Sequence, residues 1–174
     1  MIKKMEKDKN LEKDFYRKNV SLVTFDKKGR FLLVNLVHWP LDYFKFPQGG
    51  IGTGETLEQA AHREFEEELG TSKIEILAVS DIRRTYKWEN PIEIENKKYV
   101  GQKQRFMIVR FFGNDEDISL KKDEVRGCKW VDGGELEGFI NRKELDFSSY
   151  WATIRRILKE NQDLLQANGV VVCP

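Results

Sequence analysis

The chain has 174 residues, 40% of them hydrophobic, and its 30 Lys and Arg nearly balance its 29 Asp and Glu to give a formal net charge of +1. This length is typical of one domain with a single core, and the near-neutral charge excludes a global attraction to nucleic acid. Cys128 and Cys173 lack metal-ligand spacing. Without a signal peptide or a membrane-spanning apolar run, the sequence predicts a cytoplasmic protein with free thiols and no membrane partner.

The first elements expected along the chain are a charged arm and a β-hairpin. Residues 1–14 hold too few apolar side chains to pack, which predicts a mobile arm before a domain of residues 15–168. The apolar runs 20–26 and 31–37 flank a turn at Lys28 and Gly29, so we expect two antiparallel strands. Gly49 and Gly50 then end a Phe-Pro-Gln-Gly-Gly loop, where glycine lets the backbone approach a ligand closely.

A helix from about Leu57 to Leu69 is the best-marked element of the sequence. Thr56 and Gln59 have the spacing of a capping box, and Gly70 provides the C-terminal stop. Because both ends are marked, the faces of the helix follow from a rotation of about 100° per residue. The core-facing stripe should contain Leu57, Ala61, Phe65 and Leu69.

Carboxylates crowd the last turn of this helix, where the helix dipole is negative and neighbouring acids repel one another. A solvated acidic face explains Glu66, but Glu64 and Glu68 should lie on the flank of the core stripe. Partly buried carboxylates need cationic partners, and Arg63 alone cannot neutralise Glu64, Glu67 and Glu68. Clustered carboxylate oxygens are ligands for hard divalent cations, so the helix predicts a metal site.

The second half of the chain predicts three more strands and a long helix. The strands are expected at residues 74–82, 99–112 and 127–131, and residues 83–88 mix cations with rings before Pro91 breaks the run. Helical periodicity over residues 148–167 predicts one helix, and residues 169–174 form a short tail. No repeat or linker-like segment indicates a second domain.

A longer pattern spans the glycine loop and this helix: Gly49, Glu55 and the run Arg63-Glu64-Phe65-Glu66-Glu67-Glu68-Leu69-Gly70. It resembles the signature sequence, called the Nudix box, of the Nudix hydrolases. Other matches resemble the branch of RNA pyrophosphohydrolases and dinucleoside polyphosphate hydrolases. They are Tyr16-Arg17-x-Asn19, Phe46-Pro47-Gln48-Gly49-Gly50, Tyr86, Gly101-Gln102-Lys103-Gln104 and Glu124-x-x-Gly127-x-x-Trp130. The resemblance implies an α/β class fold, the Nudix α/β/α sandwich with a mixed central β-sheet, and Mg²⁺ held beside a phosphoanhydride, with Mn²⁺ as a substitute.

Three functions remain open at this point. The first is a hydrolase of 5′-triphosphorylated RNA, the second is the same chemistry on dinucleoside polyphosphates, and the third is a silent nucleotide- or RNA-binding module. The intact carboxylate set argues against the third, because a silent relative would be expected to lose Glu64, Glu67 or Glu68.

Three sets of candidate site residues follow. The metal ligands are expected to be Glu64, Glu67, Glu68 and Glu124 with a backbone carbonyl at Gln48 or Gly49. The catalytic candidates are Glu68, Glu124, Glu67 and Arg63. Either Glu68 or Glu124 is the expected general base, because phosphoryl transfer to water needs no covalent nucleophile. The substrate's outer phosphates and first base are expected at Arg17, Tyr86, Lys103 and Arg105, with Phe147 or Tyr150 as a second ring.

Overall fold

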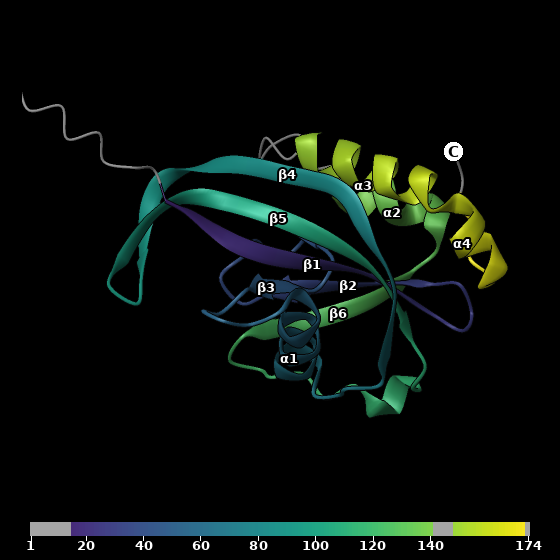
Figure 1. The fold of residues 1–174 in the computed structure, drawn as a ribbon. Coiled ribbons are helices and arrows are strands. Elements are labelled where there is room, and N and C mark those ends of the chain that lie inside the picture. The colour runs from purple at the N-terminus through teal and green to yellow at the C-terminus, as the bar shows by residue number, and fades with distance from the viewer. Residues whose placement is uncertain (1–14, 141–147, 173–174) are drawn as a thin grey trace, which may run out of the picture.

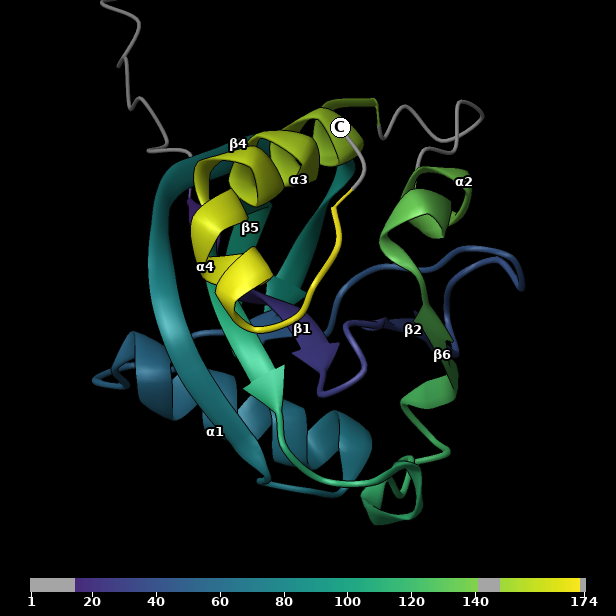
Figure 2. The same ribbon diagram turned by 90° about the vertical axis from the view of Figure 1, so that its right-hand side faces the viewer.

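The computed structural model describes residues 15–140 and 148–172, which form a mixed sheet between two helical layers. In chain order the elements are β1 (Tyr16–Asp26), β2 (Phe31–Leu36), β3 (Gln48–Gly50), α1 (Leu57–Leu69), β4 (Ile74–Ile94), β5 (Lys97–Phe111), η1 (Asp115–Asp117), β6 (Val125–Val131), η2 (Gly133–Glu135), α2 (Leu136–Ile140), α3 (Ser148–Glu160) and α4 (Gln162–Ala167). Figure 2 shows α1 on one side of the sheet and α3 with α4 on the other. This arrangement confirms the predicted α/β sandwich.

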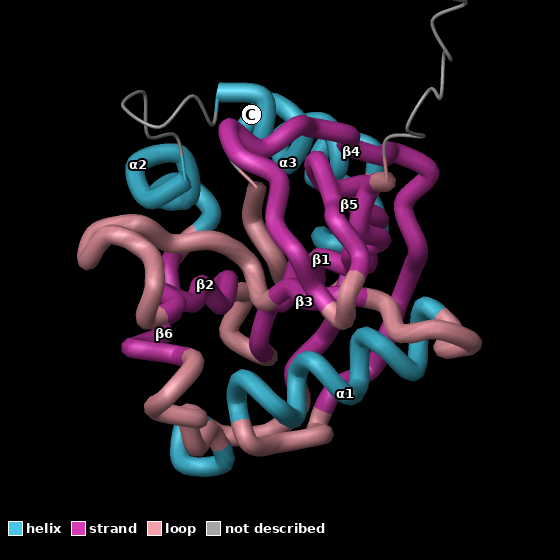
Figure 3. Tube along the Cα trace, turned by 90° about the vertical axis from the view of Figure 1, so that its left-hand side faces the viewer, coloured by secondary structure: helices cyan, strands magenta, loops and turns pink. Residues whose placement is uncertain are grey.

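The sheet has six strands in the order β4-β5-β1-β2-β6, with β3 paired to β1 outside this path. β1 and β2 form the predicted antiparallel hairpin, with Phe25 opposite Phe31. β1 pairs in parallel with β5, whereas β4 and β5 are antiparallel, so the sheet is mixed. In Figure 3, α1 crosses below the sheet and β3 lies next to it. The short strand β3 therefore places the glycine loop against α1.

Two core clusters lie on opposite sides of the sheet. The α1-side cluster contains Val20 and Leu22 of β1 packed with Ala61, Phe65 and Leu69 of the helix. The α3-side cluster joins alternate residues of the same strands to α2, α3 and α4. Because successive side chains of a strand point to opposite faces, the cluster to which a residue belongs identifies its side of the sheet.

Helix α1 has the bounds that the sequence predicts. Thr56 accepts a hydrogen bond from the backbone of Gln59, whose side chain accepts one in return from the Thr56 backbone. Gly70 ends the helix with φ 69°, a left-handed conformation that glycine adopts without strain. The capping box and the glycine stop fix the rotation of the helix, so its glutamates keep definite positions relative to the core.

Two of the expected elements differ most from the structure. β4 continues through Pro91 to Ile94, because β4 is an edge strand and its register shifts between Lys87 and Ile92, where a missing N–H costs no ladder bond. The helix expected over residues 148–167 divides at Asn161, whose side chain donates to the Ile157 carbonyl and competes with the helical ladder. Within the described residues, no helix has the length and apolar character needed to cross a bilayer.

Candidate active site

The three predicted metal ligands on α1 are buried to different extents. Glu68 is 4% exposed, the side chain of Glu64 is 13% exposed and that of Glu67 is 46% exposed. The residue expected to be a solvated acid, Glu66, is exposed. The carboxylates thus extend from the core to the surface along one flank of the helix, as its periodicity predicts.

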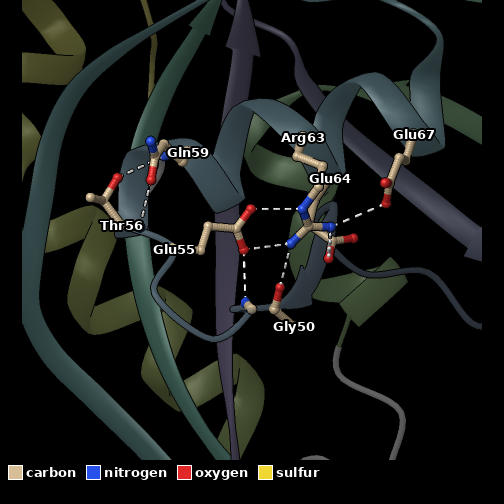
Figure 4. A network of polar contacts seen from close by, with 8 residues as sticks. Gly50, Glu55, Thr56, Gln59, Arg63, Glu64 and Glu67 are labelled. Carbon is tan, nitrogen blue, oxygen red and sulfur yellow. Dashed lines mark hydrogen bonds and ion pairs between the residues drawn. The ribbon is translucent and has the colours of Figure 1, made fainter. Parts of the chain in front are cut away.

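Arg63 is the centre of the polar network in Figure 4. Its guanidinium donates to both carboxylate oxygens of Glu55 at 2.7 and 2.8 Å and to the Gly50 carbonyl at 2.8 Å. One nitrogen, Nη1, donates to Glu64 at 2.8 Å and to Glu67 at 3.2 Å. This bonding raises the pKa of Arg63. The arginine therefore ties the glycine loop to the helix, and its expected catalytic role stays a prediction.

Glu55 completes this network from the loop before the helix. The bonds from Arg63 lower the pKa of Glu55 to about 2, and the backbone N–H of Gly52 also donates to it at 2.7 Å. Glu55 consequently stays ionised and holds the loop closed over Arg63. Its place in the signature box was the only sequence signal for this role.

Gly49 and Gly50 are required by close packing rather than by conformational freedom. A Cβ at Gly49 would lie 1.7 Å from the Glu64 carboxyl carbon, and one at Gly50 would lie 2.4 Å from Nη2 of Arg17. The two glycines therefore let a carboxylate from α1 and a guanidinium from β1 reach the same stretch of backbone. An acid and a cation approach the loop at neighbouring residues, which suits a ligand that carries both metal and phosphate.

Glu68 is the least satisfied polar group of the site. The backbone N–H of Gln48 donates to its carboxylate, but Oε2 is buried without a hydrogen-bond partner. Burial, followed by the negative charges of Glu64, Glu124 and Glu67, raises the pKa of Glu68 well above its ordinary value. A buried carboxylate oxygen without a donor is expensive unless a cation binds it. The donor set, which consists of carboxylates and backbone oxygens, fits a hard divalent cation.

The side chains do not form a ready-made cage. Among the described residues, no group of three or more His, Cys, Asp or Glu side chains is arranged to hold a metal. Arg63 pairs with both Glu64 and Glu67 through one nitrogen, so an internal cation already occupies these two carboxylates. Glu124, directly before β6, is half-exposed and is bound by Lys121 at 2.6 Å. The metal-ligand assignment therefore remains a prediction whose central residue is Glu68.

The structure divides the predicted substrate residues between the two faces of the sheet. Arg17 and Tyr86 are both aligned with Gln102, and the Tyr86 hydroxyl donates to the Gln102 side chain at 2.7 Å. Lys103 and Arg105 belong to the alternate positions of β5, and Arg105 is aligned with Val20 of the α1-side core. The expectation that one site gathers all four residues is wrong, because β5 directs neighbouring residues to opposite faces.

Tyr150, one of the two candidates for a second ring, is not available at the surface. Tyr150 is fully buried in the α3-side core, where burial raises the pKa of its hydroxyl to about 12. Tyr150 therefore cannot stack on a base without a rearrangement of the core, and this prediction is corrected. Phe147 lies outside the described residues, as do residues 1–14 and Cys173.

A buried amide network supports the loop and was missed from sequence. The side-chain nitrogen of Gln104 donates to Asn19 at 3.0 Å and to Gln48 at 2.9 Å, and Arg84 donates to the Gln104 oxygen at 3.0 Å. The guanidinium of Arg84 stacks 4.1 Å from the centre of the Tyr86 ring. Asn19 and Gln104 belong to the matched motifs, but nothing local in the sequence predicts that Arg84 is buried.

Lys45 is a second buried cation on this side of the sheet. It is 3% exposed, and its amine lies 5.0 Å from the ring centres of Tyr43 and Tyr150. Burial, together with the positive charge of Arg84, lowers the pKa of Lys45 to about 7. At neutral pH the Lys45 amine is therefore only partly protonated, and the guanidinium groups of Arg17 and Arg84 remain the permanent positive charges on this side of the sheet.

Comparison with known proteins places this geometry in context. A family model described as the NUDIX domain matches residues 15–150. The RNA pyrophosphohydrolase of Wolbachia pipientis wMel is 40% identical over 124 residues, covering 68% of this chain and 76% of the relative. The RNA pyrophosphohydrolase of Klebsiella pneumoniae (strain 342) is 29% identical over 165 residues, covering 88% of this chain and 81% of the relative.

Solved structures agree at the level of the fold. The E. coli dihydroneopterin triphosphate pyrophosphohydrolase has a TM-score of 0.58 at 15% identity, covering 83% of this chain and 95% of that chain. A C. elegans Ap4A hydrolase binary complex has a TM-score of 0.55 at 22% identity, covering 83% of this chain and 98% of that chain. At these identities the comparison concerns the backbone arrangement alone.

Proposed function

Because the chain belongs to the NUDIX domain family, we propose that it is a pyrophosphohydrolase that converts the 5′-triphosphate end of RNA to a monophosphate. The observation that carries the chemistry is the buried, donor-free Oε2 of Glu68 beside the glycine loop. The substrate is suggested by the relatives that share 29% and 40% identity with the chain, which are named RNA pyrophosphohydrolases.

The cation is proposed to be Mg²⁺, with Mn²⁺ as a substitute. Glu64, Glu67, Glu68 and Glu124 would hold it with a backbone carbonyl at Gln48 or Gly49. When bound, such a cation neutralises the charged oxygens of a phosphoanhydride and assists attack by water. Arg63 would then keep Glu64 and Glu67 on the correct flank of the helix, since it already bonds to both.

Of the two candidates for the general base, the geometry favours Glu124. A base must reach a water molecule, and the carboxylate of Glu124 is 48% exposed on the segment that leads into β6. Glu68 is almost fully enclosed, and its free oxygen suits a cation better than a mobile water. We assign proton removal from the attacking water to one oxygen of Glu124, whose other oxygen is left for the cation, and we assign the most enclosed cation contact to Glu68.

Arg17 and Tyr86 remain the proposed contacts for the far end of the substrate. The Arg17 guanidinium lies against Gly50, close enough to Glu64 to lower the pKa of that carboxyl, so it can neutralise an outer phosphate next to the carboxylates. Tyr86 is half-buried on the same side of the sheet and offers a ring to the first base. Stacking of this kind is worth about 1–3 kcal/mol and tolerates any base.

The test is a side-by-side measurement of kcat/KM with Mg²⁺ on 5′-triphosphorylated RNA, diadenosine tetraphosphate and ADP-ribose. The proposal expects the highest value for RNA. A higher value for diadenosine tetraphosphate would establish the dinucleoside polyphosphate alternative, which uses the same carboxylates. If none of the three is hydrolysed while nucleotides still bind, the chain is a silent binding module and the proposed function is wrong.

A further inference from the structure

A set of cations lies on the α1 side of the sheet, at the end where β1 begins. Lys18 on β1 is aligned with Lys103 on β5, and Arg105 on β5 is aligned with Arg83 on β4. Arg105 is also aligned with Val20, which packs in the α1-side core, so these side chains share that side. We call Lys18, Arg83, Lys103 and Arg105 the basic face.

In the part of the chain that the structure describes, the basic face has no counter-charge of its own. Within residues 15–140 and 148–172, none of its four members forms an ion pair with a carboxylate. Nε of Arg105 is buried without a hydrogen-bond partner, and the Lys103 amine lies 5.2 Å from the centre of the Tyr16 ring. Like charges directly opposite each other destabilise a sheet, as with Arg83 and Arg105. Such an arrangement is stabilised by an external anion.

No helix of the described chain covers this part of the sheet. Figure 1 shows the β4–β5 pair extending past α1 on one side and past α3 on the other. Lys18, Arg83 and Lys103 are exposed, and Arg105 is partly exposed. The basic face is therefore open to a large ligand, in contrast to the α3 side, where Arg84 and Lys45 are buried.

The basic face begins next to the proposed active site. Lys18 follows Arg17, which lies against Gly50, but the two side chains point to opposite faces of the sheet. The backbone links the basic face to the glycine loop, because the Lys18 carbonyl accepts a bond from the Ile51 N–H at 3.0 Å. A polyanion whose end is bound at the glycine loop would reach the basic face by passing from the Arg17 side of the sheet to the α1 side. Along each strand, residues of one face recur about every 6.6–6.8 Å, and neighbouring strands are about 4.8 Å apart. The cations therefore form a ladder suited to a flexible charged chain.

We propose that the basic face binds the phosphodiester backbone of single-stranded RNA downstream of the 5′ end. This inference rests on the proposed function and adds to it a second contact surface, separate from the residues that hold the pyrophosphate. Phosphate contacts by Lys and Arg add affinity without reading sequence. The core of a protein interface is enriched in aromatic anchors and depleted of charge, which the basic face does not match.

The first experiment measures binding without turnover. The probe is a labelled 5′-monophosphorylated single strand of about 16 nucleotides, followed by fluorescence anisotropy at several salt concentrations. The test variant is Lys18→Gln/Arg83→Gln. For each phosphate contact that it loses, its affinity for the strand should fall about fivefold at 0.1 M salt, and the slope of log affinity against log salt concentration should decrease in magnitude by about 0.7. The matched control, Arg156→Gln/Lys159→Gln on the exposed side of α3, should bind like the wild type.

The second experiment compares KM for a triphosphorylated strand of the same length with KM for a triphosphorylated dinucleotide. The double variant should raise KM for the long substrate only. Equal affinities for wild type and variant would overturn the inference, and so would an equal rise in KM for the dinucleotide, which would place these cations at the pyrophosphate. If no triphosphate is hydrolysed but the salt-dependent weakening of RNA binding persists, the proposed function fails and the basic face stands as an RNA-binding surface. Binding of anionic vesicles or an acidic protein, with none of RNA, would also overturn it.

Discussion

Helix α1 and the basic face each carry several charges of the same sign, but these charges are compensated in different ways. On α1 an internal cation, Arg63, bonds to Glu64 and Glu67 and to the loop acid Glu55. Of the glutamates of the site that the structure describes, Glu68 alone has a buried carboxylate oxygen without a hydrogen-bond donor. On the β4–β5 side no carboxylate of the described chain pairs with the four cations. The helix is thus prepared for one small cation, whereas the basic face depends on an extended anion from outside.

The largest effect that tests this comparison is expected from Glu68→Gln. The loss of this carboxylate should lower kcat by about 10²-fold or more, because electrostatic stabilisation at a reacting centre is typically of this size. Affinity for Mn²⁺, measured by calorimetry, should fall as well. The control is Glu66→Gln, which removes an exposed charge from the same helix. Full retention of kcat and metal affinity by Glu68→Gln would remove the residue from the site.

The same variant makes a pH prediction for the metal-free protein. The pKa of Glu68 in the fold lies above its ordinary value of 4.5, so its contribution to stability is complete below that value. That contribution is lost as pH rises toward the folded pKa, since the unfolded chain ionises first. The free energy of unfolding, measured in urea, should decline with pH more steeply for the wild type than for Glu68→Gln. Equal slopes would mean that Glu68 is not buried in its charged form.

An intermediate effect is expected from Arg63→Lys, which keeps the charge but removes the fork of the guanidinium. A lysine cannot donate to Glu55, Gly50 and Glu64 together, so we expect a loss of about 1–2 kcal/mol of stability after solvent screening. The loop would move relative to Glu64, and kcat should fall more than KM rises. In a double-mutant cycle with Glu55→Gln, the two changes should be less than additive. Strict additivity would show that Arg63 does not act through Glu55.

The part of the molecule that was predictable is the part encoded locally. The bounds of α1 follow from Thr56, Gln59 and Gly70, whose effects act within a few residues of the chain, and so does the depth of Glu68. The burial of Tyr150 also had a local signal, because Tyr150, Ile154 and Leu158 recur at helical spacing and all lie in the core. The prediction of a stacking role gave more weight to the aromatic character of Tyr150 than to this periodicity.

What could not be predicted depends on register between distant strands. Period-two alternation within β5 separates Gln102 from Lys103, but only the pairing with β1 and β4 shows which of them joins Arg17 and Tyr86. The burial of Arg84 likewise results from its contact with Gln104, twenty residues further along the chain. The prediction therefore grouped Arg17 with Lys103 and Arg105, which the sheet places on its opposite face.

The smallest predicted effect is a change in stability at the basic face. Arg83 is exposed and stands directly opposite Arg105, so Arg83→Gln should relieve repulsion and raise the free energy of unfolding by about 0.2–1 kcal/mol. The gain should shrink at high salt, because exposed charges are screened. On the helix the corresponding change, Glu67→Gln, removes a partner of Arg63 and should give no such gain. Urea unfolding of both variants at low and high salt makes the measurement, with Arg156→Gln on α3 as the control. A salt-independent loss of stability in Arg83→Gln would show that the chain already supplies a counter-charge there, and the contrast between the two regions would no longer hold.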